Sequence, residues 1–195
     1  MAKKPSTLIN MVVALLVITA VSGGLLGLVY GMTKDTIAEV DQKKNAAAIA
    51  EVLGTDENSR LETVTKDDLT YNLAYDAQGN LLGAAVKTYS NAGFSGRIEL
   101  MVGLLADGTI NKVSVLQQSE TPGLGANMVQ PKFKDQFNGK NPNNGYKLTV
   151  TKDGGDVDAI TAATITSRAF SGAVQLACDA FEAHKAEFMK GGNVQ

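Results

Sequence analysis

The sequence predicts an α+β fold, in which one domain of antiparallel strands and helices is preceded by a single N-terminal transmembrane helix. An uncharged apolar run extends from Leu8 to Met32, two hairpin patterns follow it, and a long helical pattern comes last, without β-α-β alternation. The 195 residues suffice for one domain and an appendage. We expect a cytoplasmic tail over residues 1–7, a transmembrane helix over 8–32, a helical connector over 33–55 and an extracytoplasmic domain over 56–195.

Charge and cysteine content argue against several classes of function. All 20 acidic residues follow Met32, whereas two of the 18 basic residues precede it, so residues 33–195 carry a formal charge of −4. A mildly acidic domain lacks the basic face that duplex nucleic acid requires. Cys178 is the single cysteine, which excludes an internal disulfide. One cysteine and one histidine provide neither a zinc site nor an iron–sulfur cluster, so we expect no metal.

The apolar run is long enough to cross the hydrocarbon core of a bilayer, about 30 Å, as a helix. A cleaved signal peptide is the alternative, with Ala20-Val21-Ser22 as the cleavage site. The run continues through residues 25–29, beyond an ordinary signal core, which favours a retained span. Lys3 and Lys4 favour a cytoplasmic tail and an external domain, although lysines on the other side weaken the asymmetry. Packing on another membrane helix is suggested by Gly23, Gly24, Gly27 and Gly31.

Local patterns predict the elements that follow in order. Thr33–Leu53 has helical periodicity, and Gly54 is its expected stop. Two hairpins come next, the first joining 69–75 to 81–89 through a turn at 76–80, the second joining 97–105 to 110–116 through Asp107-Gly108. One or two amphipathic turns follow Pro131, and a Gly/Asn/Pro loop covers 139–145. Short strands are expected over 146–150 and 157–160.

The last element is a helix from about Thr166 to Met189, ended by Gly191-Gly192. Cys178 and His184 lie on this helix. A single cysteine and a single histidine on a helix are ordinarily packing and surface residues, so we assign them no chemistry.

The heptad from Asp158 to Thr164 precedes this helix. It reads as an acidic residue, two spacers, a hydroxyl residue, two small residues and a second hydroxyl residue. Attachment of a phosphate to a threonine needs an exposed hydroxyl, small neighbours and an acceptor for negative charge, which the start of a helix provides. A plain helix cap is the alternative interpretation.

A second Gly- and Pro-rich loop, from Gln117 to Asn127, follows the last predicted strand. Pro122-Gly123 fits the centre of a type II turn, and that is the simpler interpretation. The functional interpretation is a wall for a flat ligand. In it, Gly123 and Gly125 let backbone amides approach a ring, Leu124 lies against the ring, and Glu120 and Thr121 reach its polar edge.

Taken together, these segments resemble one family. The single span, Phe94-Ser95-Gly96-Arg97-Ile98, the loop 120–125 and the heptad 158–164 resemble, in type and order, the FMN-binding G subunits of the Rnf complex. The homologous C subunits of the sodium-translocating NADH:quinone oxidoreductase share both loops. The similarity covers essentially the whole chain, and the compact length favours the Rnf family.

The resemblance implies that Thr164 carries FMN, joined through its side-chain oxygen to the flavin's phosphate. A dedicated flavin transferase outside the cytoplasm would transfer the FMN from FAD. The position before Ala163 is commonly glycine in the family, and here it is Ala162, which would be strained if φ were positive. The other cofactor-binding residues that we expect are Glu120, Thr121, Gly123, Leu124, Gly125, Asp158, Thr161, Ala163, Ile165 and Thr166.

The function implied is electron transfer within a membrane complex that links reduced ferredoxin and NAD to transport of Na⁺ or H⁺. Its partners would be the other membrane and iron–sulfur subunits of that complex in the cell membrane. We find no pattern of a nucleophile or an acid–base pair, so independent turnover is not expected. Two alternatives are the same domain in the quinone-reducing pump and a non-redox envelope domain that binds a ligand through the loop 120–125.

Overall fold

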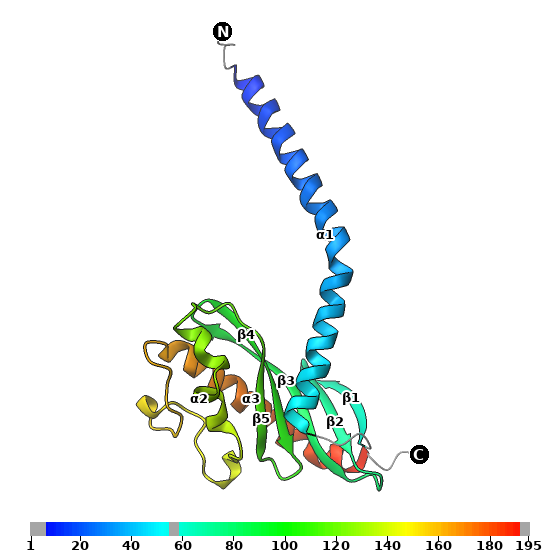
Figure 1. The fold of residues 1–195 in the computed structure, drawn as a ribbon, viewed down its shortest axis with the longest axis vertical. Coiled ribbons are helices and arrows are strands. Elements are labelled where there is room, and N and C mark those ends of the chain that lie inside the picture. Colours follow the sequence, from blue (N-terminus) through cyan, green and yellow to red (C-terminus); the bar gives the residue numbers. More distant parts are fainter. Residues whose placement is uncertain (1–6, 55–58, 192–195) are drawn as a thin grey trace. The chain divides into compact units, whose positions relative to one another are not determined.

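The computed structural model describes residues 7–54 and 59–191, and the chain divides into two compact units at Lys43/Lys44. Figure 1 shows the elements of both units in chain order. Lys3 and Lys4, on which the expected orientation depends, lie outside the described residues. The predicted division at residues 33 and 56 remains a prediction.

The first unit is helical. Helix α1, Leu8–Leu53, begins in it and has no break between Met32 and Thr33, where the sequence predicts a change from span to connector. By length and composition α1 is able to cross a membrane, and no part of its most apolar segment is buried within the protein. An exposed apolar surface of this size suits lipid or a membrane partner rather than water.

The second unit is built on a five-stranded antiparallel sheet with strand order β1-β2-β3-β4-β5. Its strands are β1 Arg60–Lys66, β2 Leu69–Tyr75, β3 Leu81–Gly93, β4 Gly96–Leu105 and β5 Ile110–Gln117. Each strand pairs with the next along the chain, as Figure 1 shows, which confirms both predicted hairpins. The antiparallel sheet with its helices confirms the predicted α+β class.

Strand β1 was not predicted. It is an edge strand, and its two ends carry Arg60 and Lys66 with no residue fully buried between them, so its apolar signal is weak. The turn to β2 is formed by Asp67 and Asp68, both with positive φ. Aspartate tolerates this conformation better than most residues, which lets two residues connect the strands.

The two faces of the sheet are covered by different helices. Helix α3, Thr164–Gly191, lies on one face, where Phe170, Val174 and Phe181 join the main apolar core. The last turns of α1 lie on the other face, where Ala48, Val52 and Leu53 pack on a smaller apolar cluster. The alternation of side chains along β2 and β3 supplies both clusters. This segment of α1 therefore belongs to the second unit.

Short helical turns connect β5 to α3. They are η1 Gly125–Val129, α2 Pro131–Lys134, η2 Asp135–Phe137, η3 Pro142–Asn144 and η4 Thr151–Asp153. Phe133 and Phe137 anchor this region against Phe170 of α3, with ring centroids 5.1 and 5.2 Å from that ring. The region thus holds the segment before α3 in place.

Three sequence predictions need correction. Residues 146–150 and 157–160 are not strands, because a single parallel bridge between Val150 and Val157 is all that forms before η4 turns the chain. Strand β3 continues beyond Tyr89 to Gly93. Helix α3 begins at Thr164 rather than at Thr166. The last two corrections extend the β3–β4 hairpin as far as its turn and place Thr164 in the first turn of α3.

Candidate functional site

The segments singled out in the sequence line one cavity of about 320 Å³. Phe94 comes from the turn between β3 and β4, and further residues come from the loop after β5 and from the start of α3. The expected site residues in its lining are Glu120, Thr121, Leu124, Gly125, Ala163, Thr164, Ile165 and Thr166.

The remaining three expected residues lie in an adjoining groove of about 640 Å³. Gly123, Asp158 and Thr161 line this groove, whereas Leu124 and Ala162 line both spaces. The structure thus places the eleven residues around two hollows whose linings share Leu124 and Ala162. It does not bring Asp158 and Thr161 into the cavity itself.

The loop after β5 is held by a tight turn. The amide of Leu124 donates to the carbonyl of Thr121 at 3.1 Å, and Gly123 has φ of 77°. A positive φ at the third turn position is the type II pattern, so the turn forms at Pro122-Gly123, as the sequence predicts. Asn127 donates to the Gly123 carbonyl at 2.9 Å and ties the turn to η1. Leu124 is left 42% exposed at the cavity.

Helix α3 begins inside the cavity lining. The amide of Ser167 donates to the Ala163 carbonyl at 3.0 Å, which makes Ala163 the residue before the first helical turn. Alanine has no side-chain oxygen with which to cap the helix. The amides of Thr164, Ile165 and Thr166 belong to the first turn, where an α-helix offers no internal acceptors. This end of α3 is therefore able to accept an anionic group.

The hydroxyl groups near this helix start have different surroundings. Ser167 Oγ donates to the Ala163 carbonyl at 3.0 Å, and Thr166 Oγ1 donates to a Glu120 carboxylate oxygen at 2.7 Å. Thr164 is half-buried and lines the cavity, and within the described ranges no protein group bonds its hydroxyl. Thr161 is exposed in the groove. Of the two threonines in the heptad, Thr164 is thus the one that lines the cavity.

Ala162 lies in the left-handed region, with φ of 59°. The resemblance to the family suggests a positive φ at position 162, because the family commonly has glycine at that position. An L-residue in this region costs about 1–2 kcal/mol, since its Cβ approaches the following carbonyl. The backbone turns at Ala162 despite this cost, and the next two residues, Ala163 and Thr164, line the cavity.

Asp158 is positioned by its backbone rather than by its side chain. Its amide donates to Gln136 Oε1 at 2.8 Å, and its carbonyl accepts from Gln136 Nε2 at 3.1 Å. The Asp158 side chain itself is exposed at the groove. Sequence reasoning missed Gln136, because a glutamine in a short amphipathic turn carries no signal for this contact. It also missed Phe94 as a lining residue, although it noted the segment 94–98.

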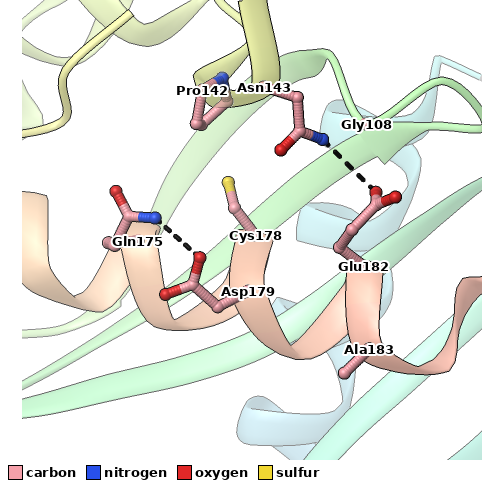
Figure 2. Close-up of a pocket in the computed structure, with 8 residues that line it drawn as sticks. All are labelled: Gly108, Pro142, Asn143, Gln175, Cys178, Asp179, Glu182 and Ala183. Atoms are coloured by element: carbon pink, nitrogen blue, oxygen red, sulfur yellow. Dashed lines mark hydrogen bonds between the residues drawn. The ribbon is translucent and has the colours of Figure 1, made fainter. Parts of the chain in front are cut away.

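A further pocket of about 470 Å³ lies between α3 and the loop around η3, away from the cavity. In Figure 2, Asn143 lies over Glu182, and Gln175 and Asp179 lie along the helix beside Cys178. Burial, with the nearby Asp179 carboxylate, raises the pKa of the Cys178 thiol to about 12. A protonated thiol is a poor nucleophile, so this pocket offers no reactive cysteine.

Comparison with known proteins identifies the family. The sequence model of the FMN-binding domain matches residues 93–179, a range that spans the whole cavity. The G subunit of an ion-translocating oxidoreductase complex from Methanosarcina acetivorans is 33% identical over 179 residues, which cover 87% of this chain and 92% of the relative. The chain belongs to this G-subunit family.

Other relatives agree with this assignment. The G subunit of the Na⁺-translocating ferredoxin:NAD⁺ oxidoreductase complex of Acetobacterium woodii is 29% identical over 184 residues, covering 86% of this chain and 88% of the relative. Among solved structures, the C subunit of the Na⁺-translocating NADH-quinone reductase from Parabacteroides distasonis has a TM-score of 0.54 at 19% identity, covering 84% of this chain and 98% of that one. This chain therefore shares its fold with the quinone-reductase protein.

Proposed function

We propose that this chain is an electron-transfer subunit of a membrane-bound, ion-translocating ferredoxin:NAD oxidoreductase complex, and that it carries FMN bound covalently to Thr164. Its place in the G-subunit family and the match to the FMN-binding domain support the redox role. The single observation that carries the attachment site is the position of Thr164, which lines the cavity at the start of α3 and whose hydroxyl is bonded by none of the described residues.

The cavity suits a flavin in shape and polarity. Phe94, Leu124 and Ile165 are exposed large apolar residues from three different segments, and all three line it. Such residues can lie against the flat ring system of a flavin. The first turn of α3 offers amides and a positive dipole end to the phosphate. When bound, FMN supplies the redox chemistry, and the chain binds and orients it.

Attachment of FMN from FAD is a balanced transfer. The bond between Thr164 Oγ1 and the phosphorus of the FMN half forms, and the bond from that phosphorus to the bridging pyrophosphate oxygen breaks. AMP leaves, and the hydroxyl proton passes to a base. We propose that a separate flavin transferase supplies that base, because the described residues bring no carboxylate or imidazole to the Thr164 hydroxyl. Asp158 and Thr161, which are both exposed, are accessible to such an enzyme.

The attachment site can be tested by fluorescence on a denaturing gel. Wild-type chain that is produced in cells together with the transferase, and then purified from membranes, should show a fluorescent flavin band. Thr164→Ala should lose the band, whereas Thr161→Ala should keep it, because Thr161 lies in the groove outside the cavity. Thr164→Ser restores a hydroxyl and controls for folding. A fluorescent Thr164→Ala protein would contradict the assignment, and a colourless wild-type protein would favour the non-redox alternative.

We further propose that the chain is a single-pass protein of the cell membrane, with its flavin domain on the extracytoplasmic side. The length and apolarity of α1 support the span, and the other membrane and iron–sulfur subunits of the complex are the proposed partners. A C-terminal reporter that is active only outside the cytoplasm should be active. Protection of the domain from protease added to spheroplasts would contradict this orientation. The corresponding role in the quinone-reducing pump is the second candidate, favoured by fold similarity alone.

A further inference from the structure

Glu120 is a buried carboxylate that joins three separate segments of the site. It belongs to the loop after β5, and its side chain lies between the β3–β4 turn and the start of α3. The amide of Ser95 donates to one carboxylate oxygen at 2.9 Å, and Thr166 Oγ1 donates to the other at 2.7 Å. We propose that Glu120 is a positioning residue, which fixes the hairpin tip to the first turn of α3 and so sets the shape of the cavity. This inference rests on the proposed function.

The backbone around the carboxylate leaves room for it and for little else. A Cβ at Gly125 would stand 2.5 Å from one carboxylate oxygen and 2.6 Å from Thr166 Oγ1. A Cβ at Gly93 would collide first with the Gly96 carbonyl oxygen and would also stand 2.8 Å from the other carboxylate oxygen. Gly125 therefore leaves room for the Glu120 side chain, and Gly93 leaves room both for that side chain and for the neighbouring strand. Gln118 Oε1 accepts the amide of Glu120 at 2.7 Å and orients its backbone as well.

Burial of a carboxylate at position 120 costs free energy, and packing alone does not require a charged group there. Glu120 is 5% exposed, and no lysine, arginine or histidine in the described part of the chain forms an ion pair with it. Removing a carboxylate from water is costly, and two charge-assisted hydrogen bonds offset part of that cost. An apolar side chain would fill the space without that cost. The carboxylate adds direction, because each oxygen fixes a different segment.

This role differs from the one expected from the sequence, in which Glu120 reaches the polar edge of the ligand. Each of its oxygens accepts one hydrogen bond from a protein donor. The segments that it joins carry Phe94 and Ile165, which line the cavity from opposite segments of the chain. Loss of the carboxylate should therefore let the turn that carries Phe94 move relative to the helix start that carries Ile165. A ring held between these side chains would lose its fixed orientation.

Two substitutions separate geometry from charge. Glu120→Gln removes the charge but retains both bonds, because its oxygen can accept from Ser95 and its NH₂ can donate to the Thr166 hydroxyl. Glu120→Ala removes both bonds. Thr166→Val removes one bond and keeps the side-chain shape, so it provides a second test if Glu120→Ala does not fold.

The first measurement is hydrogen exchange on the full-length chain in detergent. We expect the Ser95 amide to exchange at least about tenfold faster in Glu120→Ala, with β1 and β2 unchanged, and at near wild-type rate in Glu120→Gln. Thr166→Val should speed exchange at the start of α3. Unchanged protection of Ser95 in Glu120→Ala would overturn the proposal. This readout needs no flavin, so it stands even if the wild-type chain proves to be colourless.

The second measurement is the visible circular dichroism of the attached flavin, which reports a fixed asymmetric environment of the ring. Glu120→Ala should lose most of the signal while the flavin stays attached at Thr164. Glu120→Gln should retain the signal. A Glu120→Gln protein that behaves like Glu120→Ala would show that charge beside the flavin matters rather than position, and would overturn the proposal.

Discussion

The backbone of Val52, near the end of α1, packs directly on Gly103 in the middle of β4. A Cβ at position 103 would stand 2.7 Å from the carbonyl carbon of Val52 and 2.8 Å from its Cβ. The carbonyl of Val52 also accepts a hydrogen bond from Asn111 at 2.7 Å. Lys44 of α1 also donates to the carbonyl of Leu116 in β5 at 2.6 Å, which is a second hydrogen bond between this helix and the sheet. The last turns of α1 are thus part of the folded domain.

Substitution of Val52 should therefore destabilise the domain. Val52→Ala removes two methyl groups from a fully buried site, and we expect a loss of about 2 kcal/mol in the free energy of unfolding. Val40→Ala, the same substitution at an exposed site on the same helix, is the matched control and should have almost no effect. Urea unfolding of a fragment that begins at Lys34 includes both positions and measures both variants. Equal stability of the two variants would contradict the docking of α1.

The left-handed conformation of Ala162 leads to a stabilising substitution. Ala162→Gly removes the Cβ that opposes φ of 59°, and the gain should exceed the extra entropy of glycine in the unfolded chain. We expect about 1 kcal/mol of added stability in thermal or urea unfolding. Ala159→Gly, three residues earlier and without positive φ, should instead lower stability by up to about 1 kcal/mol. Destabilisation by Ala162→Gly would show that the Cβ contributes packing that outweighs the strain.

The sequence predicted the two hairpins and the last helix well, because their signals are local. Alternation in Leu69–Tyr75 and the turn at Asp107-Gly108 are sufficient by themselves to specify the strand and the turn. Strand β1 was missed because an edge strand needs little apolar alternation. Residues 146–150 were wrongly predicted as a strand, because their β-forming residues form only the single bridge between Val150 and Val157. Such outcomes depend on neighbours in space that local patterns do not encode.

The candidate site was predictable as a set of segments but not as an arrangement. The loop 120–125 and the heptad were found by their residue types, and most of their members do line one cavity. The bonds from Glu120 to Ser95 and Thr166 connect positions 25 and 46 residues away, and no local pattern indicates them. The absence of a side chain at Gly125 likewise leaves room for the Glu120 carboxylate, a contact that no local pattern indicates.

The two glycines of the loop should respond differently to alanine. At Gly125, a Cβ would collide with the Glu120 carboxylate and Thr166 Oγ1, so Gly125→Ala should disturb the cavity and lower the yield of attached flavin severalfold. At Gly123 no atom lies within 4 Å of the added Cβ, and the cost is the backbone strain at φ of 77°, about 1 kcal/mol. Gly123→Ala should therefore keep its flavin and lose modest stability. Flavin absorbance per protein, with urea unfolding, compares them, and equal flavin yields would contradict the collision.

Cys178 should be unreactive in the folded protein and should make stability fall at high pH. Its thiol has a pKa of about 12 in the fold, raised mainly by burial, against about 8.5 in an unfolded chain. At about pH 8, a thiol reagent should therefore label it slowly in buffer and quickly in urea.

The sign of the pH effect follows from which state keeps the proton. Between the two pKa values the unfolded thiol is ionised while the folded thiol is not, so the unfolded state binds fewer protons and stability falls as pH rises. The contribution is fully present below about pH 8.5 and is lost by up to about 1.4 kcal/mol per pH unit above it. Comparison with Cys178→Ala between about pH 8 and 10 isolates this group, because the tyrosines and lysines titrate in both proteins. Parallel stability curves, or rapid labelling of the native thiol, would show that Cys178 is accessible to water.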